Sequence, residues 1–401
     1  MSFRQLNREV LMTLNRRQIL AGSAAALALG ASLRPARAAG VHSDEIVIGT
    51  HLDLSGPAAA GMPALRNATE LALAEANAAG GVHGRQIRLI VEDNGSQPQL
   101  AVRAVQKLIR SDEVFALLNP FGSGTNAATI GQAVQAGTVV FAPWAASSVM
   151  HQVAGGSDLL FTTVQNYNTT MNSALTRMLP EWGVERLGGI YMEGPFGDLI
   201  HAGVTPALEA AGLTEAATAA YRPGDIDFSS QVARMRAANV DTIVAATITR
   251  ETVGVMAEVK RLGWDDVRVL TAIPGRSTVV ARLGGADTEG LYGVGGWRLH
   301  SADTTDPGAR AFMDAYQAAY GDIPDENAAN AYSYTKWFLA SLEAAGADLT
   351  AESFTEGARQ TRHSDFTTYA EAGFENNHAM PELVSIDRIE GGAWVPQTEP
   401  F

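Results

Sequence analysis

Two short loops of glycine and serine are the stretches of this sequence best suited to hold a ligand. Ser55-Gly56 follows an apolar run at residues 46–49, and Gly122-Ser123-Gly124 follows another at residues 114–119. A helical pattern begins after each loop, and the N–H groups in the first turn of a helix lack partners inside the helix and can bind an anion. The sequence therefore predicts a binding site at these loops, although the glycines could also serve only to allow tight turns.

No catalytic or metal-binding pattern accompanies these loops. The chain has no cysteine, which excludes disulfides, thiolate metal ligands and a thiol enzyme. His42, His363 and His378 lack the paired spacing of a zinc or iron site. The sequence contains neither a G-x-S-x-G nucleophile motif nor a phosphate-binding P-loop. We therefore predict a protein that binds a small molecule without transforming it and needs no cofactor; an exported cofactor enzyme remains a remote alternative.

The loops lie in a repeating order of strand, loop and helix. Residues 45–125 contain this unit three times, residues 126–142 complete a fourth, and a second series with a different sequence begins near residue 187. This alternation is typical of parallel sheets with helices on both faces, which bind ligands beyond the carboxyl ends of their strands. The predicted fold is α/β, with two doubly wound parallel-sheet lobes and a ligand cleft between them. Residues 290–296 are expected to form an extended connection from one lobe to the other.

The N-terminus has the pattern of an export signal. Arg16-Arg17 precedes an apolar run at residues 24–33, and Ala36-Arg37-Ala38 offers small residues at a cleavage site. Paired arginines favour the twin-arginine route. The apolar run is shorter than the roughly 20 residues that a membrane span needs, although a retained anchor is the alternative. We predict a signal peptide at residues 1–38 and a mature protein in the periplasm, not embedded in the membrane.

The charge of the chain argues against nucleic acid as a partner. The net charge is −14, and residues 1–38 carry six arginines but a single acidic residue, so the mature chain would be more acidic still. Such a surface repels phosphate backbones and anionic lipid headgroups.

Several short segments resemble one family of binding proteins in their order and spacing. They are Ile46-Val47-Ile48-Gly49 with Leu54-Ser55-Gly56-Pro57, the stretch from Ala74-Glu75-Ala76-Asn77 to Gly84-Arg85, Glu92-Asp93-Asn94, and Phe228-Ser229-Ser230-Gln231. Together they resemble the substrate-binding proteins of ABC importers, of the branched-chain amino acid (Leu/Ile/Val) type. The resemblance covers about residues 44–345.

The resemblance implies two lobes joined by three crossovers that close on a small ligand. Lobe 1 would hold residues 44–164 and 295–368, and lobe 2 residues 165–294 and 369–401. It implies membrane permease subunits as partners and a monomer, while a ligand-sensing domain of a membrane receptor system is an alternative. By position it assigns ligand contacts to Gly61, Gly122, Ser123, Thr125, Trp144, Ala145, Ala146, Phe196, Ile248, Thr249, Pro274 and Arg276.

Three positions depart from the pattern of the family members that bind amino acids. Gly61 replaces a tyrosine, Ala146 replaces a threonine, and no carboxylate stands at residues 273–276, where the family places the acid that receives the ligand ammonium. A buried ammonium without an anionic partner is costly. We therefore expect a carboxylate with an apolar or aromatic body, or an amide, with an amino acid as the alternative. Trp144, Phe196 and Tyr167 could instead be core residues, and Arg276 a surface charge.

Overall fold

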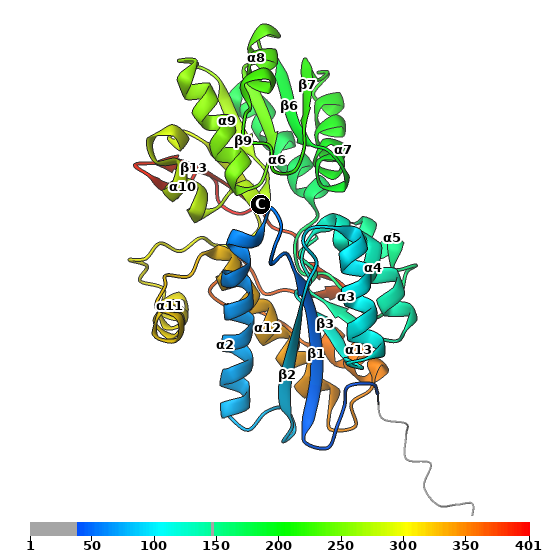
Figure 1. Ribbon diagram of the computed structural model, residues 1–401. Coiled ribbons are helices and arrows are strands. Elements are labelled where there is room, and N and C mark those ends of the chain that lie inside the picture. Colours follow the sequence, from blue (N-terminus) through cyan, green and yellow to red (C-terminus); the bar gives the residue numbers. More distant parts are fainter. Residues whose placement is uncertain (1–37, 146–147) are drawn as a thin grey trace, which may run out of the picture. The chain divides into compact units, whose positions relative to one another are not determined.

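The computed structural model describes residues 38–145 and 148–401. The expected signal peptide therefore lies outside the described residues except for Ala38, and so does Ala146. Figure 1 shows two helix-covered sheets in residues 38–401.

The first sheet has five parallel strands in the order β2-β1-β3-β4-β5. Its strands are β1 (Glu45–Leu52), β2 (Gln86–Asp93), β3 (Ala116–Leu118), β4 (Val139–Phe141) and β5 (Leu160–Phe161). One face packs against α3 (Pro98–Arg110), α4 (Ser123–Gln135) and the short α5 (Val149–Val153). The other packs against α2 (Met62–Ala78), α12 (Glu326–Ala345) and α13 (Ala351–Gln360). Alternate residues of β1 explain this division, because Ile46 and Ile48 face one layer and Val47 the other.

The second sheet has seven strands in the order β14-β13-β10-β9-β8-β6-β7. Its strands are β6 (Leu187–Met192), β7 (Ala217–Tyr221), β8 (Thr242–Ala246), β9 (Arg268–Thr271), β10 (Tyr292–Gly295), β13 (Ser385–Glu390) and β14 (Ala393–Pro396). The first five are parallel, and β13 and β14 add an antiparallel hairpin. One face packs on α6 (Tyr167–Trp182) and α7 (Pro195–Ala210), the other on α8 (Ser229–Ala237), α9 (Thr249–Arg261) and α10 (Thr278–Gly284). The expected α/β fold with two parallel-strand sheets is confirmed.

Strand β10 differs from the sequence-based expectation of an extended connection. It pairs with β9 and β13, and two of its four residues, Gly293 and Gly295, lie against the side chain of Arg276. A Cβ on Gly295 would lie 2.4 Å from Arg276 Nη1. The glycines that suggested an extended connection instead make room for the buried Arg276 side chain against a strand of the sheet.

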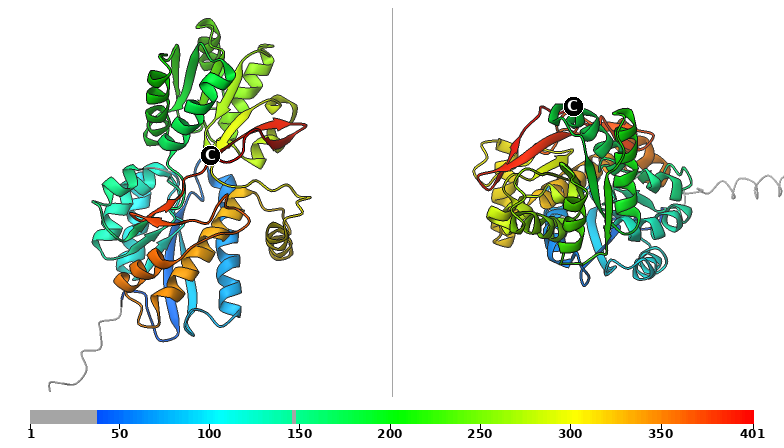
Figure 2. Two further views of the ribbon diagram at one scale, coloured as in Figure 1. Left: turned by 180° about the vertical axis from the view of Figure 1, so that it is seen from behind. Right: turned by 90° about the horizontal axis from the view of Figure 1, so that it is seen from above.

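The chain passes between the two sheets at three places, after β5, after β10 and before β13. The segment after β10 leads through α11 (Pro307–Tyr320) to α12, and the segment before β13 follows the small hairpin of β11 (Gly373–Glu375) and β12 (His378–Met380). Figure 2 shows this small hairpin beside the first sheet and the β13–β14 hairpin beside the second.

The small hairpin packs with the first sheet, in contrast to the expected placement of all residues 369–401 with the second. His378 forms a bridge with Thr162, and the Phe374 ring lies 5.0 Å from Phe161 and 4.3 Å from Trp337. A lone phenylalanine in a polar stretch gives no period-2 signal, which is why the sequence did not assign this strand.

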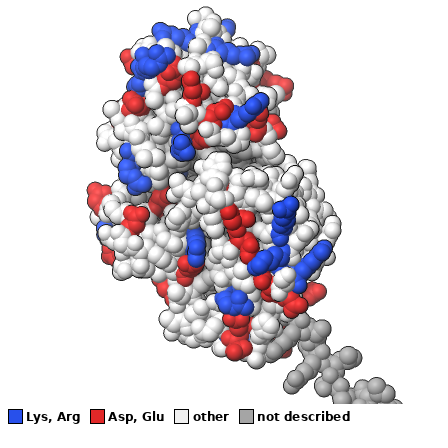
Figure 3. Space-filling model, viewed as in Figure 1, with Lys and Arg blue, Asp and Glu red and all other residues white. Residues whose placement is uncertain are grey.

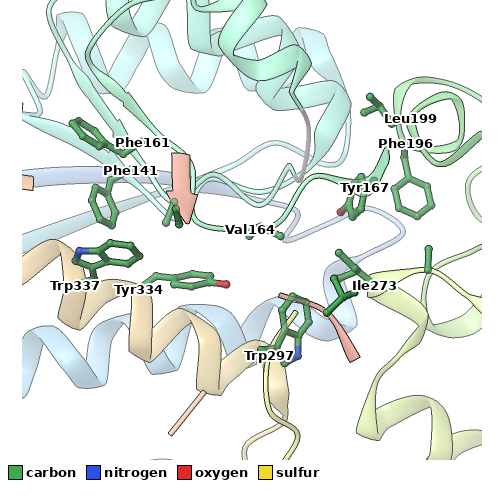
Figure 4. Packing of buried hydrophobic residues seen from close by; sticks show 14 of the residues in the cluster. Phe141, Phe161, Val164, Tyr167, Phe196, Leu199, Ile273, Trp297, Tyr334 and Trp337 are labelled. Carbon is green, nitrogen blue, oxygen red and sulfur yellow. The ribbon is translucent and has the colours of Figure 1, made fainter. Parts of the chain in front are cut away.

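An aromatic cluster holds the buried face of the first sheet. Phe141 of β4 is fully buried, and its ring lies 5.4–6.4 Å from the rings of Phe161, Trp337, Phe338, Phe354 and Phe374. Figure 4 shows Phe141 between Phe161 and Trp337. The cluster joins β4 and β5 to α12, α13 and β11, segments that are far apart in the sequence.

Among the described residues, none of the helices combines the length and the apolar character that crossing a bilayer requires.

We predict that Phe141→Ala lowers the free energy of unfolding by about 3–5 kcal/mol, because it removes the ring that the other five contact. Denaturant unfolding followed by circular dichroism measures this loss. Ile226→Ala is the matched control, since Ile226 is 76% exposed and its truncation should change stability by less than about 0.5 kcal/mol. Equal effects of the two substitutions would contradict the central role of the cluster.

Candidate ligand-binding cleft

A cavity of about 290 Å³ lies where loops of the two sheets meet. From the first sheet it is lined by residues that follow β1, β2, β3, β4 and β5, and from the second by residues that follow β6, β7, β8, β9 and β10. The carboxyl ends of the parallel strands of both sheets therefore face one cavity, as expected for this class of fold. Its size is at the lower end of the range for small-molecule sites, roughly 300 Å³.

The start of α4 supplies backbone donors to this cavity. Gly122 has φ 101°, in the left-handed region, and a Cβ there would lie 2.6 Å from Thr125 Oγ1. Glycine is therefore required for the turn, and the N–H groups of Ser123, Gly124 and Thr125 have no acceptor within the helix. The Thr125 hydroxyl donates to the Phe121 carbonyl at 2.5 Å, so it contributes no free donor. The turn thus offers backbone amides and the positive end of a helix dipole to an acceptor group of a ligand.

Aromatic side chains form the walls of the cavity. Trp144 is held by a β-bridge with Phe121 and by its backbone N–H, which donates to the Pro120 carbonyl at 2.8 Å. On the opposite side, the rings of Tyr167 and Phe196 meet edge to face at 5.1 Å, as Figure 4 shows. Tyr167 and Phe196 are buried and Trp144 is half-buried, yet all three line the cavity. They therefore pack in the core and are also in a position to contact a ligand.

Arg276 is a buried residue and not a surface charge. It is 1% exposed; its Nε donates to Asp387 at 2.6 Å, and its Nη2 donates to the Trp297 carbonyl at 3.1 Å. Tyr369 and Ser385 also accept from Nη2. Among the described residues Nη1 has no partner. The charge of Arg276 is therefore neutralised by Asp387 of β13, and its side chain supports the cavity wall.

Two carboxylates, Glu193 and Glu326, line the cavity although the sequence did not predict them as site residues. Glu193 is 54% exposed and lies 3.5 Å from Arg222. Glu326 is 6% exposed, and its Oε2 accepts from the N–H and the hydroxyl of Thr278 at 3.0 and 2.6 Å. Residues 273–276 contain no acid, but the Glu326 carboxylate from α12 is hydrogen-bonded to Thr278, two positions after that loop.

The acid next to Glu326 titrates near neutrality. Asp325 caps α12 by accepting from the N–H of Ala328 at 2.9 Å. Burial, together with the Glu326 carboxylate, raises the pKa of Asp325 to about 7. The N-terminus of α12 therefore holds two adjacent acids, the half-buried Asp325 and the buried Glu326.

The structure brings together eight of the twelve residues assigned by resemblance. Lining the cavity are Gly122, Ser123, Thr125, Trp144, Phe196, Ile248, Pro274 and Arg276. Gly61, Ala145 and Thr249 are not among the lining residues, and Ala146 lies outside the described residues.

The structure shows where the three described residues that do not line the cavity lie. Gly61 directly precedes α2, and Pro57 and Ala58 of the same loop line the cavity in its place. Ala145 packs in the core around β4, and its N–H already donates to the Pro143 carbonyl at 2.8 Å. Thr249 is the first residue of α9, one position after the lining residue Ile248.

Gly124, from the loop that the sequence predicted as a binding site, and Tyr167, which the sequence left open as a core residue, also line the cavity. Other lining residues were not predicted. They are Pro57, Ala58, Ser96, Pro98, Phe121, Val164, Met192, Glu193, Pro195, Pro223, Ile273, Trp297, Glu326 and Asn327. Most follow a strand directly, so the rule that ligands bind at strand ends could have found them. Glu326 and Asn327 begin a helix far from any strand of their own and carry no such signal.

The chain belongs to the periplasmic binding protein family, whose sequence profile matches residues 45–393. A Leu/Ile/Val-binding protein of Rhizobium johnstonii is 26% identical over 343 residues, which are 83% of this chain and 89% of the relative.

Solved structures share the fold at lower identity. One is described as a branched chain amino acid ABC transporter from Thermus thermophilus with bound valine; it has a TM-score of 0.80 at 17% identity and covers 90% of this chain and 97% of that one. Another is a solute-binding protein of an ABC transporter from R. palustris in complex with benzoate, with a TM-score of 0.78 at 17% identity, covering 88% of this chain and 95% of that one.

We predict that Asp387→Ala lowers the free energy of unfolding by about 3–5 kcal/mol, because it leaves the Arg276 charge buried without its counter-charge. The double variant Arg276→Met with Asp387→Leu should recover much of this loss, since apolar residues often replace a buried ion pair without penalty. Denaturant unfolding measures both variants. A loss below about 1 kcal/mol in Asp387→Ala would show that the ion pair is not needed.

A second prediction concerns pH. Because the folded pKa of Asp325 is raised to about 7, its ionisation destabilises the fold, and this penalty grows from about pH 4 to pH 7 and is complete above that. Asp325→Asn keeps a good helix cap and removes the charge, so it should raise the midpoint of thermal unfolding more at pH 8 than at pH 5. Asp306→Asn, at the half-buried cap of α11, controls for the change of cap residue. If Asp325→Asn changes the midpoint of thermal unfolding equally at both pH values, the pKa of Asp325 is not raised.

Proposed function

We propose that this protein is the extracytoplasmic solute-binding component of an ABC importer and captures a small organic ligand by closing its two lobes on it. The observation that carries the proposal is a cavity lined by strand-end loops of both sheets. A ligand there would contact both halves, so binding would shift the population from open to closed forms. Such a protein releases its ligand unchanged when the hinge opens, and it is not an enzyme.

The lobes follow the two sheets. We propose residues 44–164 and 295–380 as lobe 1 and residues 165–294 and 381–401 as lobe 2. The contacts of Phe374 and His378 support placing residues 373–380 with lobe 1. The three connections between the sheets would then form the hinge.

The ligand that the cavity favours has an acceptor group and an apolar body. The amides at the start of α4 suit a carboxylate or an amide oxygen, and Trp144, Tyr167 and Phe196 suit an aromatic or branched aliphatic body. Valine and benzoate, the ligands bound in the two solved structures of similar fold, both combine a carboxylate with an apolar body. We infer a ligand of this general class.

The cellular setting follows from the sequence. The export pattern at residues 1–38 supports a periplasmic protein, and membrane permease subunits would be its partners. On the face shown in Figure 3, acidic and basic side chains are interspersed and form no basic patch. This distribution and the net charge of −14 support a small-molecule ligand and no nucleic acid. We propose that the protein acts as a monomer; a sensing role beside a membrane receptor would use the same cleft.

The test is calorimetric titration of the purified protein with benzoate, hexanoate, benzamide, leucine and valine. Trp144→Ala and Phe196→Ala should each weaken the best-binding compound by about 1–3 kcal/mol, because each removes an aromatic wall of the cavity. Trp182→Ala is the matched control, since Trp182 packs on Tyr292 at 4.7 Å and does not line the cavity. Unchanged affinity in both cavity variants, or no binding of any compound, would overturn the proposed site.

A further inference from the structure

Glu326 is a buried carboxylate that faces the cleft without a cationic partner among the described residues. Its 6% exposure leaves it little contact with water, and none of the ion pairs of the described chain includes it. Its hydrogen-bond donors are the neutral N–H and hydroxyl of Thr278, both on Oε2. Oε1 meets only the Asn327 amide at the long distance of 3.5 Å.

A carboxylate in this state retains unused accepting capacity. The two carboxylate oxygens can accept about four hydrogen bonds, and Oε1 accepts only the long one from the Asn327 amide. An unpaired buried charge is unfavourable unless a cation or several strong donors approach it. The nearby Arg276 does not serve, because its charge is held by Asp387. The neighbouring Asp325 is a half-buried acid that caps the same helix, so it supplies no cation to Glu326.

We propose that Glu326 is a specificity-determining residue of the cleft, and that its Oε1 accepts a hydrogen bond from a protonated nitrogen of the ligand. The inference rests on the proposed function, since it concerns the solute bound in that cleft. The ligand would place an acceptor end at the start of α4, an apolar body between the aromatic walls, and an ammonium group at the start of α12. The cleft would therefore prefer compounds that carry an amine to the same compounds without it, contrary to the expectation drawn from residues 273–276.

One other role for Glu326 must be distinguished from this one. Thr278 belongs to α10 on the second sheet, and Glu326 to α12 on the first, so their hydrogen bonds also tie the two halves together. A residue that acts only in closure would affect every ligand alike. A residue that accepts an ammonium would affect only ligands that have one.

The experiment uses two pairs of compounds that differ only in the amine: leucine with 4-methylpentanoate, and phenylalanine with 3-phenylpropanoate. Calorimetric titration of the wild-type protein at pH 7.5 should show, in at least one pair, that the amine-bearing compound has a Kd at least tenfold lower than its amine-free partner. The ratio of these two Kd values is the quantity to compare among variants. Glu326→Gln preserves the shape and can still accept from Thr278, and it should reduce this ratio at least tenfold. Glu343→Gln, which neutralises an exposed acid of the same helix that does not line the cavity, should leave the ratio unchanged.

Two further variants keep the test decisive. Glu326→Asp withdraws the carboxylate by one methylene and should also lower the ratio, which covers the case in which Glu326→Gln does not fold. Thr278→Val removes only the hydroxyl donor across the cleft and should change both members of a pair by the same factor.

Three outcomes would overturn the inference. If the amine-free acids bind as tightly as their partners, Glu326 does not select for nitrogen, and the proposed solute-binding function stands. If Glu326→Gln weakens both members of a pair equally, Glu326 is a closure contact only. If none of the four compounds binds, the inference fails, and the proposed function fails with it only when benzoate, hexanoate and benzamide also fail to bind.

Discussion

A ligand enclosed between two sheets loses its water and must find a protein partner for each of its polar groups. This constraint explains how the cleft is built. The parallel strands of both sheets end at the cavity, so it is lined by loops and helix starts, where backbone amides lack partners within the secondary structure. Between these polar points the lining is proline and aromatic, which removes water without adding competing hydrogen bonds. Specificity then depends on a few buried polar atoms.

The two buried charges at the cavity differ in whether the protein already satisfies them. Arg276 is held by Asp387, the Trp297 carbonyl, Tyr369 and Ser385, which lie on or near the connections between the sheets. Its charge stabilises the framework and is not available as a free cation. Glu326 has two neutral donors and no cation among the described residues. An arginine in a cleft is readily taken for the ligand-binding charge, yet here the arginine already has a counter-charge and the acid does not.

The sequence predicted the features that depend on neighbouring residues. The turn at Gly122, the apolar run at residues 46–49, and the order of strands and helices are local patterns, and the structure has them. Contacts between distant segments could not be predicted in this way. Glu326 reaches Thr278 across 48 positions of sequence, and β11 joins the first sheet through the single ring of Phe374. Nothing in either segment alone indicates its partner.

The position of Glu326 also connects ligand chemistry to closure. In an open form, separation of α10 from α12 would break the Thr278 hydrogen bonds and return the carboxylate to water, where its charge is well solvated. Closing without a ligand would bury that charge with only neutral donors, which is unfavourable. A ligand nitrogen that pairs with Oε1 would remove this penalty only in the closed form. Such a ligand would bind the closed form more tightly than the open form, which is what a shift of population requires. Glu326 would then both select the ligand and favour the open form of the empty protein.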